Sequence, residues 1–346
     1  MVSQKFSPIF SIFWFFFVAF PHSTNSLHSL SSNSNICDNK TLINPRFLRS
    51  DQLTVIINGY SDHRIPLLTE IAAAYAVSPV VAAVVVIWGN PATSSETLIS
   101  LSKNLSTLYT SGAPVKVIPQ KSKSLNSRFI PGRWIKTRGV LICDDDVDVD
   151  AKSVEFAFRV WQVNQDRLIG LFARSHSLDL GKRGWIYTVH PNRYSIVLTK
   201  FMMVNVEYMY LYSCGIDGLV DKFTTMRGVV DDMQNCEDIL MNFVVADVVN
   251  QGPILVGAER VRDWGDARNE VAEKKRVTQV DAGLSGVKRG RGEHRKRRGN
   301  CIREFHKILG RMPLRYNFGK IVNSVSEQGL CEKSGKLVPC DRQIFV

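Results

Sequence analysis

Continuous apolar runs that alternate with helix-like segments constrain the fold of this chain more than any other sequence feature. Between residues 53 and 162, runs rich in Val and Ile alternate with stretches typical of helices. We therefore expect strands at residues 53–58, 80–90, 115–118 and 139–143, and helices at residues 63–77, 94–109 and 151–162. Strands without polar interruptions are typical of a parallel sheet that helices cover on both faces. The prediction is an α/β fold with a mostly parallel central sheet flanked by helices.

The second half of the chain has shorter elements and one long polar stretch. Strands are expected at residues 168–173, 195–198 and 254–257, and a helix at residues 235–250. Residues 264–299 have few apolar side chains and many glycines and charges, so they are expected to form a mobile loop. Because no internal repeat or break in composition divides the chain, we expect one α/β domain at residues 51–320 and a tail at 321–346.

Composition and charge narrow the classes of protein and of partner. Of 346 residues, 45% are hydrophobic and 10% are aromatic, which is enough apolar material for a buried core and excludes wholesale disorder. Forty-four basic against 32 acidic residues give a net charge of +12. Residues 288–298 alone carry seven cations and one Glu, a net of +6. Such an excess favours an anionic partner: nucleic acid, a membrane surface or a phosphate-bearing substrate.

The N-terminal segment predicts export and contact with a membrane. Residues 6–20 are almost wholly apolar and are followed by a stretch rich in Ser and Asn. Fifteen apolar residues are short for a transmembrane helix, which usually needs about 20. A signal anchor and a cleaved signal peptide therefore both remain open for residues 1–22, with a flexible stem at 23–50. Export also makes nucleic acid an unsuitable partner for the basic run.

Cysteine usage and glycosylation triplets are consistent with the secretory pathway. Seven cysteines include no pair spaced as in a zinc module, which favours ordinary disulfides in an oxidising compartment. The odd number leaves at least one thiol unpaired within the chain, and Cys143, which ends an apolar run, is expected to be a buried thiol. The triplets at Asn39 and Asn104 fit a lumenal domain. That domain would be anchored in the Golgi or endoplasmic reticulum membrane, or soluble or secreted if the signal is cleaved.

Three adjacent carboxylates follow the strand expected at residues 139–143: Asp144, Asp145 and Asp146. Ligands of open α/β sheets gather outside the carboxyl ends of strands, which is where these residues fall. Adjacent carboxylates repel one another unless solvent or a divalent cation neutralises them. The triplet is therefore either a solvated loop or a site where Mg²⁺ or Mn²⁺ bridges to a diphosphate. An EF-hand is excluded, because Ala151 stands where that loop requires glycine.

A second group of carboxylates lies within residues 229–246. Glu237 and Asp238 open the expected helix, and acidic residues in a first helical turn ordinarily complement the helix dipole. Asp231 and Asp232 precede that helix and have no such explanation. Of the four, Asp231 and Asp232 are therefore the stronger candidates for a functional role.

Four segments resemble, in their order and spacing, the exostosin-like family 64 glycosyltransferases, nearest the plant branch associated with mannosylation of inositol phosphorylceramide lipids. They are CDDDVDVD at residues 143–150, VDDMQNCEDILMNF at 230–243, RGEH at 291–294 and RMPLRY at 311–316. The resemblance extends over residues 53–316. It implies a GT-A nucleotide-sugar-binding fold, a manganese-dependent acidic motif and retention of the anomeric configuration.

The resemblance implies donor-binding roles for residues at matching positions. Asp144, Asp145 and Asp146 resemble the motif for metal and diphosphate, with Asp144 and Asp146 as metal ligands and Asp146 as the most direct one. Asp144 and Asp145 would also contact the nucleotide sugar. The other positions that resemble nucleotide contacts are Arg64, Asn90, Asn126 and Arg128.

The resemblance also implies a catalytic pair and a disulfide. Asp232 resembles the carboxylate near the acceptor and the anomeric carbon, and Arg291 resembles the arginine that stabilises the departing diphosphate. Cys236 and Cys301 resemble the family's disulfide pair. Residues 283–294 depart from the pattern, because they lack the expected aromatics and carry extra residues. The choice of Arg291 rests on the Glu-His that follows it and on its spacing to Cys301.

These features predict a retaining, metal-assisted transferase. It would move a hexose or N-acetylhexosamine from a UDP- or GDP-sugar to a glycan or sphingolipid-type acceptor in the secretory pathway. Mn²⁺ is the expected cofactor and Mg²⁺ the alternative. Retention could proceed on the front face of the sugar or through a covalent intermediate on Asp232. The competing hypothesis is a catalytically inactive lumenal protein that binds carbohydrate or lipid, against which the paired acidic and basic residues argue.

Overall fold

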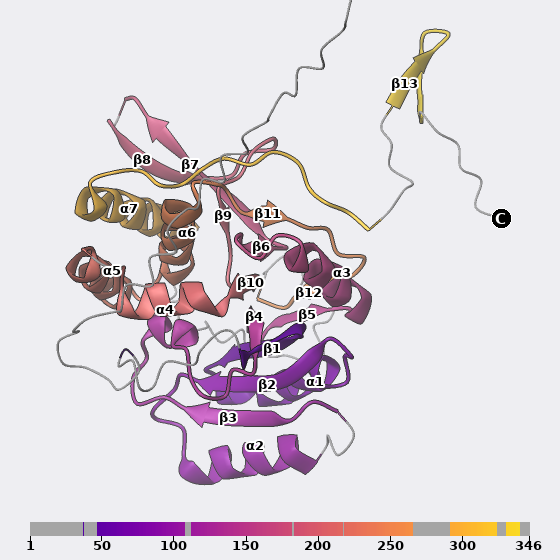
Figure 1. Ribbon diagram of the computed structural model, residues 1–346, viewed down its shortest axis with the longest axis vertical. Coiled ribbons are helices and arrows are strands. Elements are labelled where there is room, and N and C mark those ends of the chain that lie inside the picture. The colour runs from indigo at the N-terminus through magenta and orange to yellow at the C-terminus, as the bar shows by residue number, and fades with distance from the viewer. Residues whose placement is uncertain are drawn as a thin grey trace, which may run out of the picture.

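A seven-stranded sheet lies at the centre of the protein (Figure 1). The computed structural model describes residues 37, 47–107, 112–181, 183–216, 218–265, 291–323 and 330–339. The strand order is β11-β6-β10-β4-β1-β2-β3. Val and Ile fill β1 and β2, whose central residues are almost all buried, as strands covered on both faces require. The strands are β1 (Arg49–Gly59), β2 (Val81–Trp88), β3 (Val115–Pro119), β4 (Thr137–Asp144), β6 (Ile169–Gly170), β10 (Phe201–Asn205) and β11 (Ile254–Leu255).

All strands of this sheet except β10 run in the same direction. β1 is parallel to β2 and β4, β2 is parallel to β3, and β6 is parallel to β11. β10 is antiparallel to β4 and β6. The register pairs Asn58 of β1 with Ile87 of β2 and with Asp144 of β4. The carboxyl ends of these three strands therefore meet at one edge of the sheet.

Helices cover both faces because the central strands send alternate side chains to two apolar clusters. Ile56 and Ile142 pack on one face with α4, α5, α6 and α7, whereas Val55 and Leu141 pack on the other with α1, α2 and α3. α6 is apolar all round and buried from Glu237 to Ala246, as expected of a helix that runs through a core. The helices are α1 (Ile65–Ala76), α2 (Ser95–Thr107), α3 (Ala151–Gln162), α4 (Val206–Cys214), α5 (Val220–Met233), α6 (Glu237–Val249) and α7 (Arg291–Leu309).

Smaller elements complete the described structure. A three-stranded sheet, β8-β7-β9, packs on α7, and β12 pairs with β5 directly after the acidic triplet. β13 and β14 form a separate hairpin, and two short 3₁₀ helices, η2 and η3, follow β1 and β3. Their bounds are β5 (Val147–Val149), β7 (Ala173–Asp179), β8 (Gly184–Thr188), β9 (Ile196–Val197), β12 (Val261–Asp263), β13 (Leu330–Lys333), β14 (Lys336–Pro339), η2 (Asp62–Arg64) and η3 (Leu125–Phe129).

The predicted α/β fold with a mostly parallel sheet is confirmed, and one predicted loop is wrong. Residues 264–299 were expected to be a mobile loop, but residues 291–299 form the start of α7. Arg, Lys and Glu have good helix propensity, and the helix buries Ile302, Phe305 and Leu309. Residues 266–290 lie outside the described residues.

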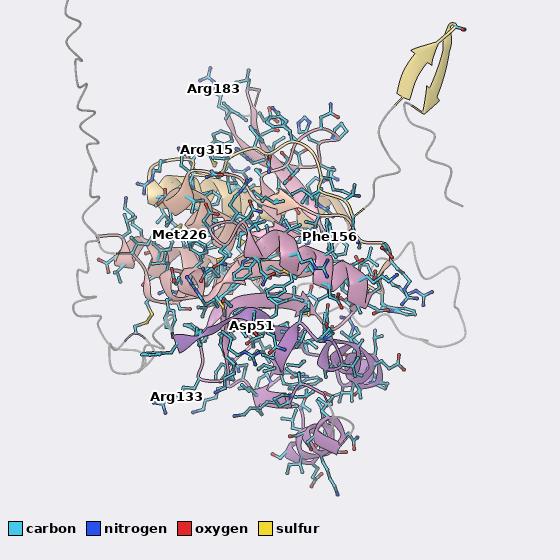
Figure 2. All side chains as sticks on the ribbon, turned by 45° about the vertical axis from the view of Figure 1, so that its right-hand side comes forward. Asp51, Arg133, Phe156, Arg183, Met226 and Arg315 are labelled. Atoms are coloured by element: carbon cyan, nitrogen blue, oxygen red, sulfur yellow. A yellow bond between two sulfur atoms is a disulfide. The ribbon has the colours of Figure 1, made fainter. Side chains whose placement is uncertain are left out.

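The predicted disulfide between Cys236 and Cys301 is present, with 6.4 Å between the two Cα atoms. A second disulfide joins Cys37 to Cys214 at the end of α4, with a Cα separation of 5.6 Å. Cys143 is buried with a free thiol, as predicted. Figure 2 shows all described side chains, with disulfides as yellow bonds. The first disulfide ties the start of α6 to the middle of α7.

The N-terminal predictions stay predictions. The expected export segment at residues 1–22 and most of the stem at 23–50 lie outside the described residues, as does Asn39. Within the described ranges, no helix is long and apolar enough to cross a membrane. The other glycosylation triplet is on α2, where Asn104 is exposed. The domain boundaries at 51–320 and 321–346 also remain predictions.

Candidate active site

The acidic triplet lies at the carboxyl edge of the central sheet. Asp144 is the last residue of β4, and Asp145 and Asp146 turn the chain into β5. Asp145 and Asp146 are buried, with 3% and 8% of their surfaces exposed. Tyr60, directly after β1, donates its backbone N–H to Asp145 Oδ2 at 3.4 Å. The triplet is therefore enclosed at the edge of the sheet and is not a solvated loop.

Arg64, in the segment that joins β1 to α1, is the first counter-charge of the triplet. Its Nη1 donates to Asp145 Oδ1 and to Asp146 Oδ2, both at 2.9 Å. Because β1 and β4 are neighbours, the loop after β1 delivers this arginine to the end of β4. Arg64 thus lies beside the triplet, and its predicted role as a nucleotide contact stays a prediction.

Arg128 joins the triplet to the start of α6. Its side chain is only 4% exposed, and its Nη1 lies 3.1 Å from Asp144 Oδ1 and 3.2 Å from Glu237 Oε1. Glu237 also accepts a hydrogen bond from the Thr199 hydroxyl at 3.1 Å. One guanidinium thus links a carboxylate of β4 with a carboxylate that is far away in the sequence.

Asp238, the next residue of α6, pairs with Arg298 of α7. Arg298 Nη2 lies 2.6 Å from Asp238 Oδ2, and its Nη1 donates to Asn235 Oδ1 at 2.9 Å. The guanidinium also lies over the Tyr187 ring, 4.6 Å from its centre. Its Nε is buried and has no hydrogen-bond partner among the described residues. Arg298 is therefore a buried cation with one N–H donor that makes no hydrogen bond within the described structure.

Burial and neighbouring charges perturb the pKa values of these groups. Burial and then the charge of Asp144 raise the pKa of Asp146 to about 7. Burial also raises the pKa of Glu237, although Arg128 opposes the change. For Arg298, burial lowers the pKa, but the attractions of Asp238, Tyr187 and Glu237 together more than offset it, so the pKa is raised. Perturbed groups that gather at a strand edge are typical of a functional site.

Two predicted nucleotide contacts, Asn126 and Asn90, make hydrogen bonds within the protein, and their roles toward the nucleotide stay predictions. Asn126 Nδ2 donates to Asp231 Oδ1 at 2.9 Å and to the Arg227 carbonyl at 3.1 Å. Its Oδ1 accepts from the Tyr212 hydroxyl at 2.5 Å, so the whole amide is used to hold η3 against α4 and α5. Asn90, directly after the β2 edge, accepts from the Ala92 backbone N–H at 3.1 Å and is half-buried. Of the two, Asn90 is better placed to reach a ligand.

Of the two predicted catalytic residues, only Asp232 has a described side chain. Asp232 is exposed in the last turn of α5, and within the described structure it makes no hydrogen bond or ion pair with the triplet, Arg128 or Arg298. Arg291 begins α7, and its side chain lies outside the described residues. The sequence interpretation missed Glu237 and Asp238, because the helix dipole already explained them. Their sequence signal was the adjacent Cys236, which the disulfide fixes beside α7.

The triplet can supply ligands for a divalent cation. Among the side chains that the structure describes, no group of three His, Cys, Asp or Glu residues is arranged to hold a metal ion. Asp146 Oδ1 is nevertheless buried and has no hydrogen-bond partner there. Mn²⁺ and Mg²⁺ bind carboxylate oxygens, and a buried oxygen without a partner is costly in the absence of a ligand. The residues therefore fit such a cation in donor chemistry.

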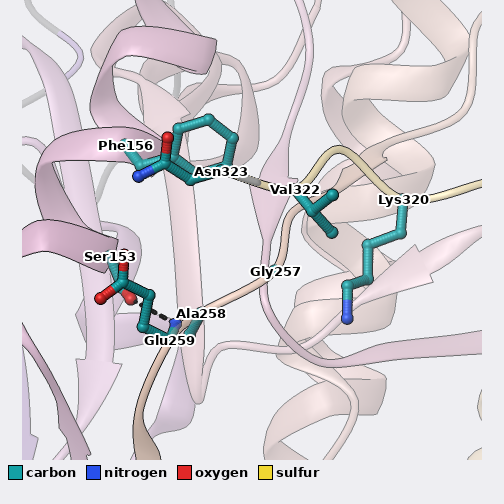
Figure 3. Close-up of a pocket in the computed structure, with 8 residues that line it drawn as sticks. All are labelled: Ser153, Phe156, Gly257, Ala258, Glu259, Lys320, Val322 and Asn323. Carbon is teal, nitrogen blue, oxygen red and sulfur yellow. Dashed lines mark hydrogen bonds between the residues drawn. The ribbon is translucent and has the colours of Figure 1, made fainter. Parts of the chain in front are cut away.

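Two cavities lie near the charged edge and near α3. One of about 210 Å³ is lined by Ser122, Lys123, Ser124, Leu125, Asp231 and Gln234. One of its lining residues, Lys123, has its Nζ 5.9 Å from the centre of the ring of Tyr60, the residue that follows β1. The other, of about 200 Å³, lies where α3 meets residues 257–259 and 320–323 (Figure 3). Its lining includes none of the carboxylates or arginines of the network.

Fold and site together define the class: an α/β protein whose carboxylates and arginines gather at the carboxyl ends of parallel strands. Residues 53–326 match the glycosyl transferase family 64 domain. The chain is 56% identical to "Glycosyltransferase family protein 64 C3" of Arabidopsis thaliana over 333 residues, which cover 96% of the chain and 98% of that protein. It is 36% identical to exostosin-1a of Danio rerio over 204 residues, or 58% of the chain and 25% of that protein. The chain belongs to glycosyl transferase family 64.

Two solved glycosyltransferase structures are similar at low sequence identity. GalNAc-T7 with UDP, GalNAc and Mn²⁺ gives a TM-score of 0.40 at 10% identity and covers 57% of this chain and 41% of that chain. The mannosyltransferase PcManGT from Pyrobaculum calidifontis, in complex with GDP-Man and Mn²⁺, gives 0.36 at 14% identity and covers 58% and 66%. The assignment of this chain as a glycosyltransferase rests on the family and not on these similarities.

Proposed function

We propose that the protein is a retaining glycosyltransferase that uses a nucleotide sugar and a divalent cation. The donor would be a UDP- or GDP-sugar that carries a hexose or N-acetylhexosamine. The acceptor would be a glycan or a sphingolipid-type glycolipid. Family membership and the chemistry of the charged edge support this proposal.

The observation that carries the proposal is a chain of buried charges from one side of the site to the other. It begins at Arg64 and the triplet and passes through Arg128 to Glu237 and Asp238. It ends at Arg298 of α7. Carboxylates suit a metal-bound diphosphate, and buried arginines suit phosphate oxygens, for which the planar guanidinium offers paired donors.

Asp144 and Asp146 would hold Mn²⁺, or Mg²⁺ in its place. The cation, when bound, would neutralise negative charge on the diphosphate. Arg298 would add fixed positive charge through its free Nε–H, which needs no reorganisation as the bond between sugar and diphosphate lengthens. In this scheme the cation and the arginine would both stabilise negative charge on the leaving diphosphate.

The structure leads us to propose Glu237 and Asp238, in place of Asp232, as the carboxylates near the anomeric carbon. Both are buried, and Glu237 is connected to the triplet through Arg128 while Asp238 pairs with Arg298, whereas Asp232 is exposed on α5. We also propose Arg298 as the arginine near the diphosphate, because it is buried and pairs with Asp238, whereas the Arg291 side chain lies outside the described residues. Front-face transfer and a covalent intermediate on one of these carboxylates both remain compatible with retention.

We also propose that the protein works in the lumen of the Golgi or endoplasmic reticulum. The apolar segment at residues 6–20 and the glycosylation triplets support an exported chain. The two disulfides support an oxidising compartment. Expression of the full chain with a fluorescent tag, followed by protease protection of microsomes, tests this part of the proposal: a digested tag on the C-terminal side contradicts it.

Purified lumenal domain should transfer sugar from one member of a panel of UDP- and GDP-sugars and should lose activity on chelation. Asp146→Asn should lower kcat by about two orders of magnitude or more, while folding stays near wild type, because loss of one preorganised charge has effects of that size. Asp51→Asn, at an exposed carboxylate on β1, is the matched control and should be fully active. The anomeric configuration of the product, read by NMR, tests retention.

Two results would contradict the proposal. One is full activity in the presence of a chelator, which removes the role of the cation. The other is tight binding of a carbohydrate or lipid without transfer from any donor, which would favour the binding protein as the function.

A further inference from the structure

Arg64 already pairs with Asp146, one of the two carboxylates proposed to bind the cation, and with its neighbour Asp145. A single nitrogen, Nη1, lies 2.9 Å from Asp145 Oδ1 and 2.9 Å from Asp146 Oδ2. The Arg64 side chain is 19% exposed, whereas those of Asp145 and Asp146 are 5% and 12% exposed. The arginine thus lies on the solvent side of two carboxylates that are otherwise enclosed.

The other approach to the same Asp146 oxygen is closed by backbone. Trp264 donates its N–H to the Asp146 carbonyl at 2.8 Å, which holds the end of β12 over the triplet. A Cβ atom placed on Gly265 would overlap Asp146 Oδ2. Oδ2 therefore has the Gly265 backbone on one side and Arg64 as its hydrogen-bond donor, so a ligand at this oxygen would compete with Arg64.

The second oxygen of Asp146 is in the opposite situation. Oδ1 is buried, and none of the described residues gives it a hydrogen bond. The carboxylate therefore has one oxygen that is occupied by an arginine and one that is prepared for a ligand. Such an asymmetry suits a carboxylate that can bind either the Arg64 guanidinium or a divalent cation.

We propose that Arg64 is a built-in counter-cation that competes with the divalent cation for Asp146, while it also compensates the neighbouring Asp145. The inference rests on the proposed function. In the protein without ligands, Arg64 keeps the buried carboxylates compensated. When the divalent cation enters through Asp146 Oδ1, Arg64 leaves Oδ2 and turns outward to the phosphate oxygens of the donor. Arg64 is thus a positioning residue that couples binding of the cation to binding of the donor.

If Arg64 competes with the cation, removal of Arg64 should increase the affinity for Mn²⁺. In wild type, part of the binding energy of the cation is spent on displacing Arg64, so Mn²⁺ alone binds weakly. Removal of the arginine leaves the carboxylates without a partner, which destabilises the unliganded protein. Mn²⁺ should then bind more tightly and stabilise the protein more, because a ligand that binds only the folded state raises its stability by mass action.

The experiment compares wild type, Arg64→Gln, Arg64→Lys and Arg133→Gln with Mn²⁺ as the only ligand. Arg133, which follows η3 in the sequence, is exposed and serves as the matched control (Figure 2). Electron paramagnetic resonance of free Mn²⁺ gives the Kd, and thermal unfolding with and without Mn²⁺ gives the shift in Tm. We expect Arg64→Gln to have a lower Tm in chelator and a Kd for Mn²⁺ lower by about tenfold or more, since unit charges this close interact by several kcal/mol.

Each outcome decides the inference. Arg64→Lys should have a Kd between wild type and Arg64→Gln, which keeps the test available if the glutamine variant does not fold. An unchanged or weaker Mn²⁺ affinity in the Arg64 variants overturns the competition but leaves the proposed function standing. Absence of Mn²⁺ binding in every variant overturns both. A similar gain in Arg133→Gln also overturns the inference, because any lost positive charge would then suffice.

Discussion

At the residue scale, Asp238 and Arg298 depend on each other because both are buried. Asp238 is 3% and Arg298 is 6% exposed, and the ion pair between them spans 2.6 Å. Removal of one partner from a buried pair leaves an uncompensated charge, whereas removal of both can be nearly neutral. The pair therefore matters for folding as well as for the proposed chemistry.

Arg298→Met should lower the free energy of unfolding by about 3 to 5 kcal/mol, the usual cost of an orphaned buried charge. The double variant Asp238→Leu/Arg298→Met should regain most of that stability and stay inactive. Chemical denaturation of both proteins measures this. Arg295→Met, at an exposed position of the same helix, is the control and should change stability by less than about 0.5 kcal/mol. Equal stability of the single and double variants would contradict the pairing.

His176 provides a pH-dependent contribution to stability away from the active site. It is buried, its ring stacks on Tyr316 with 4.6 Å between centres, and its Nδ1 lies 2.7 Å from the Ser195 hydroxyl. Burial, and then the charges of Arg193 and Arg315, lower the pKa of His176 to about 4. In the unfolded chain the pKa would be about 6.5, so the unfolded state binds the proton first as the pH falls.

The protein should therefore lose stability through His176 as the pH falls from about 6.5 to about 4, by about 3 kcal/mol in total. The sign follows from linkage: stability rises with pH wherever the unfolded state binds more protons. His176→Gln should flatten this part of the profile, and His190→Gln, at an exposed histidine, should leave it unchanged. Denaturation series at pH 7, 5.5 and 4 measure the difference, and parallel profiles for wild type and His176→Gln would contradict it.

At the scale of elements, the Cys236–Cys301 disulfide fixes how α6 and α7 meet. Cys236 precedes α6 with φ of 80°, a left-handed conformation that residues other than glycine rarely adopt. Glu237 and Asp238 follow it directly, and Arg298 stands one turn before Cys301. The bond therefore holds the two proposed catalytic carboxylates and the arginine in one arrangement.

Cys236→Ser/Cys301→Ser should lower the free energy of unfolding by about 4 kcal/mol, because the bond closes a loop of 65 residues. kcat should fall more than KM rises, since the pair positions groups for the chemical step. Cys143→Ala, which removes a free buried thiol, is the control and should keep normal kcat. Two free thiols at Cys236 and Cys301 in peptide mapping of non-reduced wild type would refute the bond itself.

The sequence predicted the helices and strands that have a regular pattern of apolar residues. It did not predict the start of α7 or the ion pairs of the site. β1, β2, β4 and α3 appear close to their expected bounds, because runs and spacing of apolar residues are local signals. The start of α7 was missed because cations dominate its first turns, and its apolar face shows only from Cys301 onward. Arg128, Glu237 and Arg298 meet across long stretches of chain, so no local pattern could reveal their pairing.

At the scale of the whole molecule, the net charge of +12 is unevenly distributed. Half of this net positive charge falls in residues 288–298. The cations of this segment nevertheless differ in burial. Arg298 is buried, whereas Arg295 and Lys296 are exposed and Arg297 is half-buried on the same helix. The run is therefore not one uniform patch. Its exposed part can attract an anionic membrane surface, while Arg298 belongs to the charged network.

The triple variant Arg295→Gln/Lys296→Gln/Arg297→Gln should keep wild-type kcat and raise KM for an acceptor in anionic vesicles. Each exposed cation near such a surface contributes about 1 kcal/mol, so the loss of vesicle binding could reach about a hundredfold at low salt. The effect should fade at high ionic strength, because salt screens exposed charges over about 10 Å. Arg298→Gln should instead lower kcat at every salt concentration.

The control for this variant removes the same charge elsewhere: Lys103, Lys116 and Lys121, all exposed on α2 and around β3, at the opposite end of the molecule from α7 (Figure 1). If net charge alone drew the protein to the vesicle, both triple variants should raise KM equally. If the exposed turns of α7 face the membrane, only the first should do so. Steady-state kinetics at two salt concentrations, with one soluble and one vesicle-bound acceptor, separates these cases. A loss of kcat in the α7 triple variant on the soluble acceptor would contradict the separate roles of the exposed cations and Arg298. These cations would then act in the chemical step together with Arg298.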